Sequence, residues 1–356
     1  MTRRTHRTVA LLGAAALAAT VLPGCAFSSS ASNTDPKTVV LVTHDSWAMD
    51  KAVIAEFEKQ SGYTLKVTSN GDAGALTNKL VLTRDDPIGD VVFGIDNTFA
   101  SRAADAGILQ DYTPAAMPAS SAGYVLPQQS GGAKLTPVDY GDVCINVDDS
   151  WFAAHHKTPP RTLDDLTRPS YRDQLVVPGP TSSSPGLAFL LTTIAAKGES
   201  GWQGYWRKLI DNGVKIDAGW SDAYEADFTG GGGKGDRPIV LSYASSPPFT
   251  IPKGASKPTT SALLDTCFRQ VEYAGVLEGA HNSKGAKAFV DFMEHRRFQA
   301  ALPDQMYVYP VDRTVGLPAD WATFAKVASK PYVVSPGDIT AHRSQWLRQW
   351  RDLAAK

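Results

Sequence analysis

The chain of 356 residues contains only three cysteines, and none of them lies in a CxxC sequence. It has no HExxH sequence either, so no metal site of a familiar spacing is supported. Basic residues do not outnumber acidic ones: 35 lysines and arginines stand against 36 aspartates and glutamates. Nucleic-acid-binding proteins usually carry a basic surface, and we therefore expect no nucleic-acid partner.

Catalytic motifs are also missing. The sequence GGGGKG, 230–235, lacks the serine or threonine that follows the lysine of a phosphate loop, and it precedes a predicted strand instead of a helix. Residues 219–223, GWSDA, lack the second glycine of a nucleophile elbow. We therefore expect no enzyme activity, no catalytic residue, no metal and no cofactor.

Only one long uncharged run exists, VALLGAAALAATVL at 9–22, and it follows three arginines. It is too short to span a bilayer comfortably and suits the apolar core of a signal peptide. The next residues, Pro23-Gly24-Cys25, complete a sequence that resembles the bacterial lipobox, although Pro23 is a less usual residue there. This resemblance implies cleavage after residue 24, a lipid on Cys25 and a flexible tether over 25–37. An ordinary secretory leader followed by a buried cysteine is the alternative.

Strands and helices alternate along the rest of the chain, which favours an α/β fold with parallel, doubly wound sheets. Predicted strands cover 38–44, 63–69, 90–95, 173–180 and 239–246. Predicted helices cover 50–62, 75–84, 97–109, 181–198, 201–213, 283–302 and 338–356. The length suggests two lobes, and no internal repeat is evident.

Polar residues follow three strands of the first half. His44 and Asp45 follow the first strand, Asp72 follows the second, and Asp96 follows the third. Open α/β sheets bind ligands in a crevice at the carboxyl ends of their strands, so we expect these residues near a binding site. Alternatively, such residues only cap helices.

The second half offers serines and aromatic residues near the ends of its elements. Ser184 is a predicted N-cap with Pro185 after it, and hydroxyls with free backbone N–H groups at a helix start bind anions well. Trp220 lies in a predicted glycine-rich loop, and aromatic faces with nearby carboxylates suit a flat cationic ligand. An exported two-lobed protein with a crevice and no catalytic motif reads as a solute receptor.

The chain resembles the periplasmic thiamine-binding proteins of bacterial ABC importers. The similar segments are DVVFGIDN (90–97), PVDYG (137–141), TSSSPGL (181–187), GWSDAY (219–224), IVLSYASSP (239–247), QVEYAG (270–275), YPV (309–311) and AHRSQWLRQW (341–350). The resemblance implies a two-lobed type II periplasmic-binding-protein fold in which each lobe is a doubly wound sheet and two crossover strands form the hinge. It implies one lobe of 38–137 with 270–316 and another of 138–269 with 317–356.

The same resemblance implies a pocket that holds thiamine or its phosphates. The implied ligand-binding residues are Asp72, Ser183, Ser184, Trp220, Tyr243, Ala244, Ser245, Ser246 and Tyr307, to which the strand ends add Asp45 and Asp96. Three positions depart from the family, which tends to have Trp at Tyr307, a hydroxylated aromatic at Phe249 and Tyr at His44.

Two cysteines remain after Cys25. From the residues alone, Cys144 and Cys267 are either a disulfide, as exported proteins permit, or two buried thiols. The family fold implies hinge strands near 138–147 and 265–275, and we hypothesise that the two cysteines are close enough there to form a bridge that restrains the hinge.

The predicted function is therefore capture of thiamine or a thiamine phosphate by a monomer that is lipid-anchored outside the cytoplasmic membrane and delivers its ligand to an ABC permease. One alternative is a receptor of the same fold for another cationic solute or ferric iron. Another is a thiamine-degrading transferase with a nucleophilic cysteine in the cleft.

Overall fold

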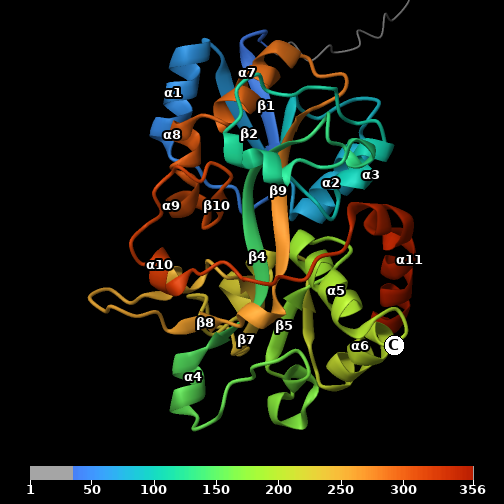
Figure 1. Cartoon of the computed structure of the whole chain (residues 1–356), viewed down its shortest axis with the longest axis vertical. Coiled ribbons are helices and arrows are strands. Elements are labelled where there is room, and N and C mark those ends of the chain that lie inside the picture. Colours follow the sequence, from blue (N-terminus) through green and yellow to red (C-terminus); the bar gives the residue numbers. More distant parts are fainter. Residues whose placement is uncertain (1–34, 356) are drawn as a thin grey trace, which may run out of the picture. The chain divides into compact units, whose positions relative to one another are not determined.

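The strands form one curved sheet in the order β2-β1-β3-β9-β4-β7-β5-β6, with β8 and β10 pairing to β4 (Figure 1). This computed structural model describes residues 35–355, so the predicted leader and Cys25 lie outside the described residues. The strands are β1 (Thr38–Thr43), β2 (Thr64–Ser69), β3 (Val91–Asp96), β4 (Thr136–Asp148), β5 (Leu175–Pro178), β6 (Lys215–Asp217), β7 (Ile239–Tyr243), β8 (Thr260–Ala262), β9 (Phe268–Val276) and β10 (Tyr309–Pro310).

The sheet has two parallel parts that are joined by antiparallel strands. β1 pairs in parallel with β2 and β3, and β5 pairs in parallel with β6 and β7. We call the part built on β1, β2 and β3 the first lobe and the part built on β5, β6 and β7 the second lobe. The long strands β4 and β9 pair with each other and run through both lobes at the centre of Figure 1. This is the predicted two-lobed fold with two crossover strands, in which hydrogen bonding continues from one lobe to the other. The residue boundaries predicted for the lobes stay a prediction.

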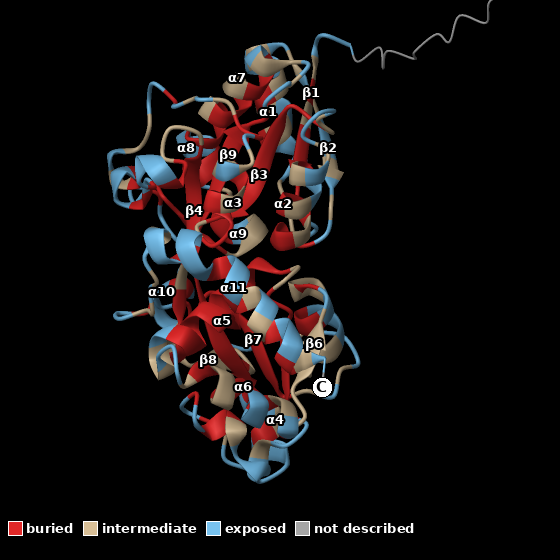
Figure 2. Ribbon diagram, turned by 90° about the vertical axis from the view of Figure 1, so that its right-hand side faces the viewer, coloured by how far each residue is buried: buried red, intermediate tan, exposed pale blue. Residues whose placement is uncertain are grey.

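Helices cover both faces of the sheet, so its central strands such as β3 and β4 are buried, whereas the edge strand β2 is largely exposed (Figure 2). The helices are α1 (Lys51–Ser61), α2 (Ala73–Leu82), α3 (Ala100–Asp105), α4 (Asp149–Ala154), α5 (Ser184–Lys197), α6 (Trp202–Asp211), α7 (Ser283–Met293), α8 (Arg296–Gln299), α9 (Leu302–Met306), α10 (Trp321–Phe324) and α11 (Pro336–Ala354). The largest apolar core lies on one face and extends through both lobes. Another core packs α1 and α7 against the opposite face of the first lobe.

Local signals account for several helix ends. The Asp50 side chain accepts a hydrogen bond from the Ala52 amide at the start of α1, and Gly62 ends that helix at φ 74°, as predicted. The predicted N-cap of α5 is wrong by one residue. Ser183 is the N-cap, because its hydroxyl accepts a hydrogen bond from the Gly186 amide. Ser184 is thus the first helical residue, and its side chain is available for other contacts.

The single helix predicted over 283–302 is wrong, because the chain forms the separate helices α7, α8 and α9 there. His295 is extended, with φ −70° and ψ 142°. The turn at His295 lets Phe298 pack against Phe289 and Phe292 in the same core. Burial of a third aromatic ring outweighs the continuous helical pattern, since burying one such side chain contributes about 2 kcal/mol.

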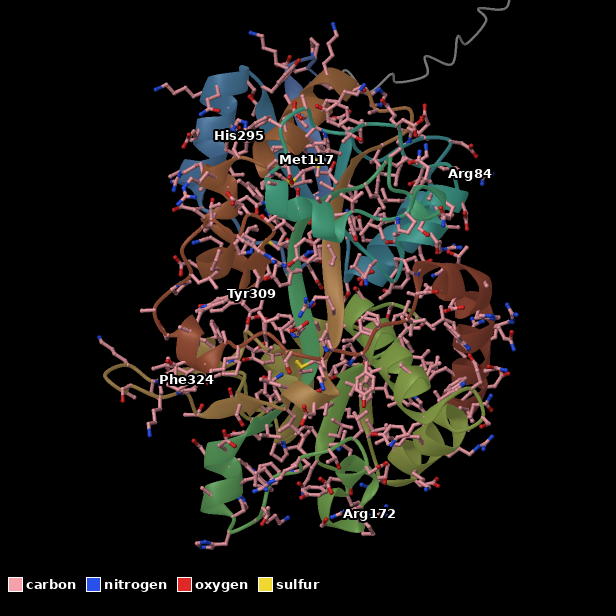
Figure 3. The ribbon with its side chains drawn as sticks, in the orientation of Figure 1. Arg84, Met117, Arg172, His295, Tyr309 and Phe324 are labelled. Carbon is pink, nitrogen blue, oxygen red and sulfur yellow. A yellow bond between two sulfur atoms is a disulfide. The ribbon has the colours of Figure 1, made fainter. Side chains whose placement is uncertain are left out.

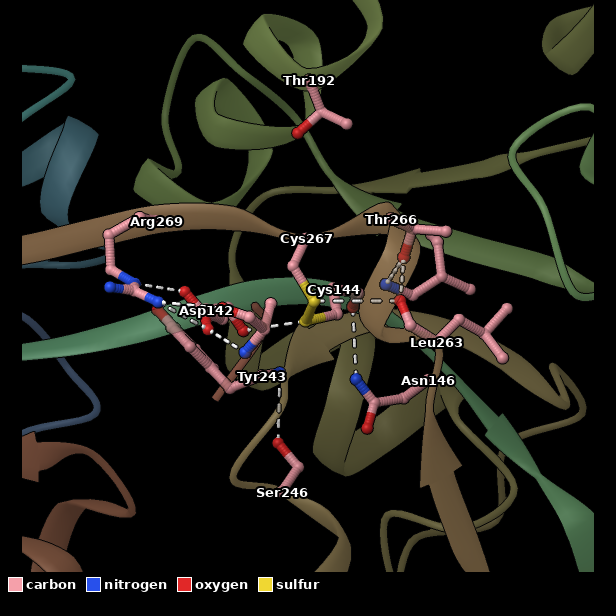
Figure 4. Close-up of a disulfide and its surroundings, with 12 residues drawn as sticks. Asp142, Cys144, Asn146, Thr192, Tyr243, Ser246, Leu263, Thr266, Cys267 and Arg269 are labelled. Atoms are coloured by element: carbon pink, nitrogen blue, oxygen red, sulfur yellow. Dashed lines mark hydrogen bonds and ion pairs between the residues drawn. A yellow bond between two sulfur atoms is a disulfide. The ribbon is translucent and has the colours of Figure 1, made fainter. Parts of the chain in front are cut away.

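A disulfide joins Cys144 of β4 to Cys267, the residue before β9, and their Cα atoms are 4.2 Å apart. The bond lies where β4 and β9 enter the second lobe, below the centre of Figure 3, which also labels Tyr309 beside β4. Arg269 reaches across to Asp142 directly beside it (Figure 4). The two hinge strands are therefore fixed to each other at their second-lobe end.

Among residues 35–355, no helix is both long enough and apolar enough to cross a membrane.

Candidate functional site

A cavity of about 250 Å³ lies between the two lobes. The first lobe contributes the segments after β1 and β2, and the second lobe contributes the start of α5, the turn after β6 and the residues after β7. β9 forms part of its wall, and residues 305–308 close another side. Its lining includes His44, Asp72, Ser184, Trp220, Tyr224, Glu225, Tyr243, Ser246, Phe249, Gln270, Glu272 and Tyr307. The predicted crevice at the carboxyl ends of the strands is thus present.

Asp72 connects the two lobes. Its Oδ1 caps α2 by accepting from the Ala73 amide at 2.6 Å, and the same atom accepts from the Ser184 amide at 3.1 Å. Its Oδ2 accepts from the Trp220 amide at 2.9 Å. Burial raises the pKa of Asp72, and the hydrogen bonds from Trp220 and Ser184 oppose that rise. A single carboxylate of the first lobe therefore satisfies amides at the starts of two elements of the second lobe.

The serine turn at the start of α5 is already occupied by the chain's own acids. The Ser184 amide donates to Asp72, and the Ser184 hydroxyl donates to the buried Asp96. Burial raises the pKa of Asp96 to about 7, against the lowering effect of the hydrogen bonds from Ser184 and Thr98. The predicted anion-binding turn thus faces carboxylates in this conformation.

Aromatic rings form the second-lobe wall of the cavity. Trp220 stacks on Tyr224 with ring centroids 4.9 Å apart and planes 12° apart. The Trp220 Nε1 donates to the Ser242 hydroxyl at 3.0 Å, and Ser242 in turn lies 2.8 Å from the Ser246 hydroxyl. Tyr243 donates from its hydroxyl to Gln270 at 3.1 Å. These hydrogen bonds fix the orientations of the Trp220 and Tyr243 rings, so their faces are kept in place as flat binding surfaces.

Trp220 does not lie in a loop, as was predicted. A helical turn starts at Trp220, and the chain continues as a π-helix over Asp222–Asp227. π-Helical turns are rare and frequently occur at functional sites. The wider turn puts Trp220 and Tyr224, four residues apart, on the same side, where their rings stack against each other.

Tyr307 and Phe249 form an aromatic edge of the cavity. Their ring centroids are 5.1 Å apart and the rings meet edge to face. Tyr307 has a left-handed backbone, with φ 56°, which is unfavourable for a bulky residue and tends to be retained where function requires it. The side chain of Phe249 is 55% exposed, so the edge it forms opens to solvent. Tyr309, two residues on, is buried and does not line the cavity.

The floor of the cavity holds a histidine among acids. The Nε2 of His44 lies 3.4 Å from Oε1 of Glu272, and both side chains are more than 90% buried. Burial alone lowers the pKa of His44, but the charges of Glu272, Asp72 and Asp45 together raise it above its ordinary value. The surrounding carboxylates therefore favour the charged form of His44.

Behind Glu272 lies a second carboxyl group. Asp139 of β4 is fully buried and is the cross-strand partner of Glu272 on β9. Neither oxygen of Asp139 accepts a hydrogen bond from a donor among the described residues. Burial, followed by the charge of Glu272 and a hydrogen bond between the two carboxyl groups, raises the pKa of Asp139 well above its usual range. This shift favours the protonated form of Asp139 beside Glu272.

Several predicted site residues do not line the cavity. Asp45 is exposed, and Ala244 packs beside the disulfide. Ser183 caps α5, Asp96 lies beneath Ser184, and the Ser245 hydroxyl donates to the carbonyl of Tyr307. The last three therefore position residues that do line it. Asp72, Ser184, Trp220, Tyr243, Ser246 and Tyr307 lie on the cavity wall.

Glu272 and Gln270 were missed as site residues. Both lie in the QVEYAG segment, and an acidic residue in the middle of an otherwise apolar strand was the signal that pointed to Glu272. Glu225 was also missed, because its contact with the cavity depends on the π-helix. With these residues the wall carries three carboxylates, and none of the described residues lining it is a lysine or an arginine.

Known proteins share this architecture. Residues 86–243 match the family model described as bacterial extracellular solute-binding protein. The thiamine-binding periplasmic protein of Escherichia coli is 28% identical over 323 residues, which cover 89% of this chain and 94% of the relative.

Two solved structures extend the comparison. A periplasmic thiamin binding protein superposes with a TM-score of 0.76 at 27% identity, covering 90% of this chain and 96% of its own. Iron-bound HitA from Pseudomonas aeruginosa has a TM-score of 0.69 at 19% identity, covering 89% of this chain and 99% of its own, and shows the fold alone. With the two-lobed sheet and the cavity between its lobes, these similarities lead to one conclusion: the chain has the type II periplasmic-binding-protein fold, and its residues 86–243 are similar to the bacterial extracellular solute-binding proteins.

Proposed function

We propose that this protein captures thiamine in the cavity between its lobes and delivers it to an ABC permease. The observation that carries the proposal is the combination of aromatic rings with three carboxylates, Asp72, Glu225 and Glu272, on a wall without lysine or arginine among its described residues. A flat heteroaromatic cation matches such a wall, since rings attract cations through their faces and carboxylates balance the charge. The thiamine-binding names of the relatives support the same ligand.

The parts of thiamine have complementary partners on the wall. Trp220 and Tyr243 offer ring faces for the thiazolium or the aminopyrimidine. The carboxylates of Glu272 and Asp72 suit the exocyclic amino group and the positive charge. Ser246 offers a hydroxyl for the hydroxyethyl tail. Each of these side chains lines the cavity.

The unphosphorylated vitamin suits the cavity better than its phosphates. A phosphate favours the amide and hydroxyl at a helix start, but at α5 these groups of Ser184 donate to Asp72 and Asp96. A diphosphate placed there would meet two carboxylates at close range, which disfavours binding through like-charge repulsion. We therefore expect affinity to fall in the order thiamine, monophosphate, diphosphate.

The proposed function involves no bond-making step. A cysteine-dependent transferase needs a free thiolate in the cleft, whereas Cys144 and Cys267 are bonded to each other on the hinge strands. Ferric iron is also less well supported. Tyr309 is buried and does not line the cavity, and no group of three or more His, Cys, Asp or Glu residues within 35–355 is arranged to hold a metal.

The same proposal includes export and anchoring. The basic start, the apolar run and Cys25 support a lipoprotein leader, and the periplasmic relatives support a location outside the cytoplasmic membrane. A lipid on Cys25 would keep the receptor near its permease. Mass spectrometry of the membrane-associated chain tests this, because a diacylated or triacylated peptide that starts at Cys25 is expected.

Calorimetric titration tests the ligand. The chain from residue 26 onward contains the whole compact unit and avoids the lipid. We expect one site per chain, with thiamine bound most tightly of the three forms and unchanged after prolonged incubation. Absence of heat with all three would reject thiamine capture, and a consumed ligand would favour the transferase.

Substitution of Trp220 tests the site. Trp220→Ala removes the stacked ring without touching the backbone amide that Asp72 accepts from. A desolvated cation–ring contact contributes about 2 kcal/mol, so we expect thiamine affinity to fall about 30-fold. Trp151→Ala is the matched control, because Trp151 stacks on His155 at α4, away from the cavity, and it should change affinity less than twofold.

A further inference from the structure

The cavity floor combines a buried histidine with acids from three directions. His44 follows β1, Glu272 reaches it from β9, and Asp72 approaches from the start of α2. Asp45 is the neighbouring residue in the chain and is exposed, and Phe93 of β3 contributes an uncharged ring 5.6 Å from the imidazole. Every ionisable group that faces His44 is therefore an acid. In the described part of the cavity wall, His44 is the one side chain able to carry a positive charge near neutral pH.

Glu272 is shared between this histidine and Asp139. Asp139 lies behind Glu272 on the hinge strand β4, and burial together with the charge of Glu272 raises its pKa, which favours its neutral form. Toward the cavity, Glu272 faces the Nε2 of His44 at 3.4 Å, and that nitrogen makes no hydrogen bond to a described residue. The distance is longer than a good hydrogen bond, so the imidazolium is attracted by charge more than it is fixed by geometry. A second cation can therefore replace it electrostatically without breaking a well-formed bond.

We propose that His44 exchanges its proton for the positive charge of the ligand, so that a cationic solute enters the cavity as a proton leaves. This inference rests on the proposed function and adds a pH rule for its ligand: a fixed cation of the thiazolium kind competes with the imidazole proton, whereas a neutral ring of the same shape does not. Two positive charges beside one buried acid cluster repel each other strongly, since water is largely excluded there. Loss of the imidazole proton removes that repulsion and leaves Glu272 to balance the ligand.

The direction of the pH dependence follows from this exchange. Before binding, nearby carboxylates raise the pKa of His44, so the ring is protonated over a wide range. A bound cation lowers that pKa, and linkage then requires affinity to increase with pH between the bound and the free pKa values. Within that window, affinity should change by up to tenfold per pH unit when one proton is exchanged.

Calorimetry in paired buffers measures the exchange directly. Thiamine is titrated into the protein at the same pH in phosphate and in Tris, whose ionisation enthalpies differ widely. A released proton is taken up by the buffer, so the two observed enthalpies should differ in proportion to the number of protons released. We expect close to one proton at a pH below the free pKa of His44, and fewer at higher pH.

Two variants test whether His44 is the group that releases the proton. His44→Gln should bind thiamine with equal enthalpy in both buffers and with an affinity that no longer increases with pH. His44→Tyr, the residue that the resemblance carries at this position, provides the same test with an aromatic side chain if the glutamine variant folds poorly. His155→Gln is the matched control, because His155 is exposed on α4, and it should release the same proton as the unmodified chain.

The outcomes separate this exchange from the proposed function. Thiamine binding with equal enthalpies in the two buffers would overturn the exchange and leave the receptor intact. Proton release that survives in His44→Gln but disappears in Asp139→Asn would overturn the assignment to His44 and transfer it to the hinge acid. A chain that binds no thiamine at any pH would overturn both.

Discussion

Two aspartates three residues apart on β4 face opposite kinds of partner on β9. Asp142 faces Arg269, and Asp139 faces Glu272. Both aspartates are fully buried. Arg269 forms a two-point ion pair with Asp142, whose Oδ2 also accepts from the Ala328 amide at 2.7 Å. Asp139 faces no such cation, and burial together with the charge of Glu272 raises its pKa, which favours its neutral form.

The difference distinguishes the two ends of the hinge. We call the end with Asp142 and Arg269 the fixed end, and the end with Asp139 and Glu272 the responsive end. At Asp142 the balancing charge is part of the fold, and the disulfide at Cys144 adds a covalent link next to it. At Asp139 no cation of the fold lies opposite, and the neighbouring Glu272 is the acid that can be balanced by His44 or by a cationic ligand. Buried ionisable groups with shifted pKa values cluster at functional sites for this reason. The cavity lies at the responsive end.

The largest expected effect comes from removing the covalent link at the fixed end. Replacing Cys144 and Cys267 together by serine releases a loop whose ends are separated by 123 residues. The chain-entropy account of such a loop predicts a loss of about 5 kcal/mol in the free energy of unfolding. Urea unfolding of the two proteins measures it. A loss below about 1 kcal/mol would mean that the neighbouring ion pair holds this end alone.

The next effect comes from breaking the ion pair. Arg269→Met leaves the buried Asp142 without its cation, which costs about 3 kcal/mol when one partner of a buried pair is removed. Arg84→Met is the matched control, because Arg84 and Asp85 form a pair whose side chains are 55% and 95% exposed. The control should change the free energy of unfolding by less than about 0.5 kcal/mol. Equal effects would contradict the distinction between the two ends.

Replacing Asp139 at the responsive end should change how the free energy of unfolding depends on pH. Asp139→Asn keeps a hydrogen-bond donor for Glu272 but needs no proton. Because the folded pKa of Asp139 is above its unfolded value, the unmodified chain loses stability as pH rises between these values, by about 1.4 kcal/mol per unit. The variant lacks this loss, so its stability relative to the unmodified chain should increase with pH.

Urea unfolding between pH 4.5 and 7 measures that difference. Asp96, whose pKa is about 7, titrates in both proteins and cancels from the comparison. The surface variant Asp85→Asn controls for removal of a charge. If the unfolding free energies of the two proteins ran parallel over this range, Asp139 would not be the protonated member of its pair.

The smallest expected effect concerns the pKa of His44 and the acids around it. Glu272→Gln removes a buried acid 3.4 Å from His44, whereas Asp45→Asn removes an exposed one whose charge is weakened by water. Both changes should lower the pKa of His44, with Glu272→Gln giving the larger decrease. An NMR titration of the imidazole ring measures both. A larger effect of Asp45 would show that the cavity floor is open to solvent.

Much of the fold follows from local patterns in the sequence. Asp50 and Gly62 mark the ends of α1 because a cap and a left-handed glycine need only their nearest neighbours. The polar residues after β1 and β2 were predicted to lie near a binding site, and His44 and Asp72 do line the cavity, because the carboxyl ends of parallel strands share an edge of the sheet. Asp45, one residue from His44, faces solvent, since neighbouring residues in an extended segment point in different directions.

What escaped prediction depends on contacts distant in the sequence. The break after α7 depends on Phe298 reaching the rings of Phe289 and Phe292. The role of Asp72 as a contact between lobes depends on amides 112 and 148 residues further along the chain. The pairing of Asp139 with Glu272 depends on the register of β4 against β9. No local pattern in the sequence predicts these long-range contacts.

The disulfide also determines what a single proteolytic cut does to the protein. The segment between Cys144 and Cys267 contains Ser184, Trp220, Tyr224 and Tyr243, the greater part of the second-lobe wall. Its most glycine-rich turn is exposed at 232–234, a ready position for cleavage. A single cut anywhere in this segment leaves two fragments joined through sulfur, so a nicked receptor stays one molecule and its halves separate only under a reductant.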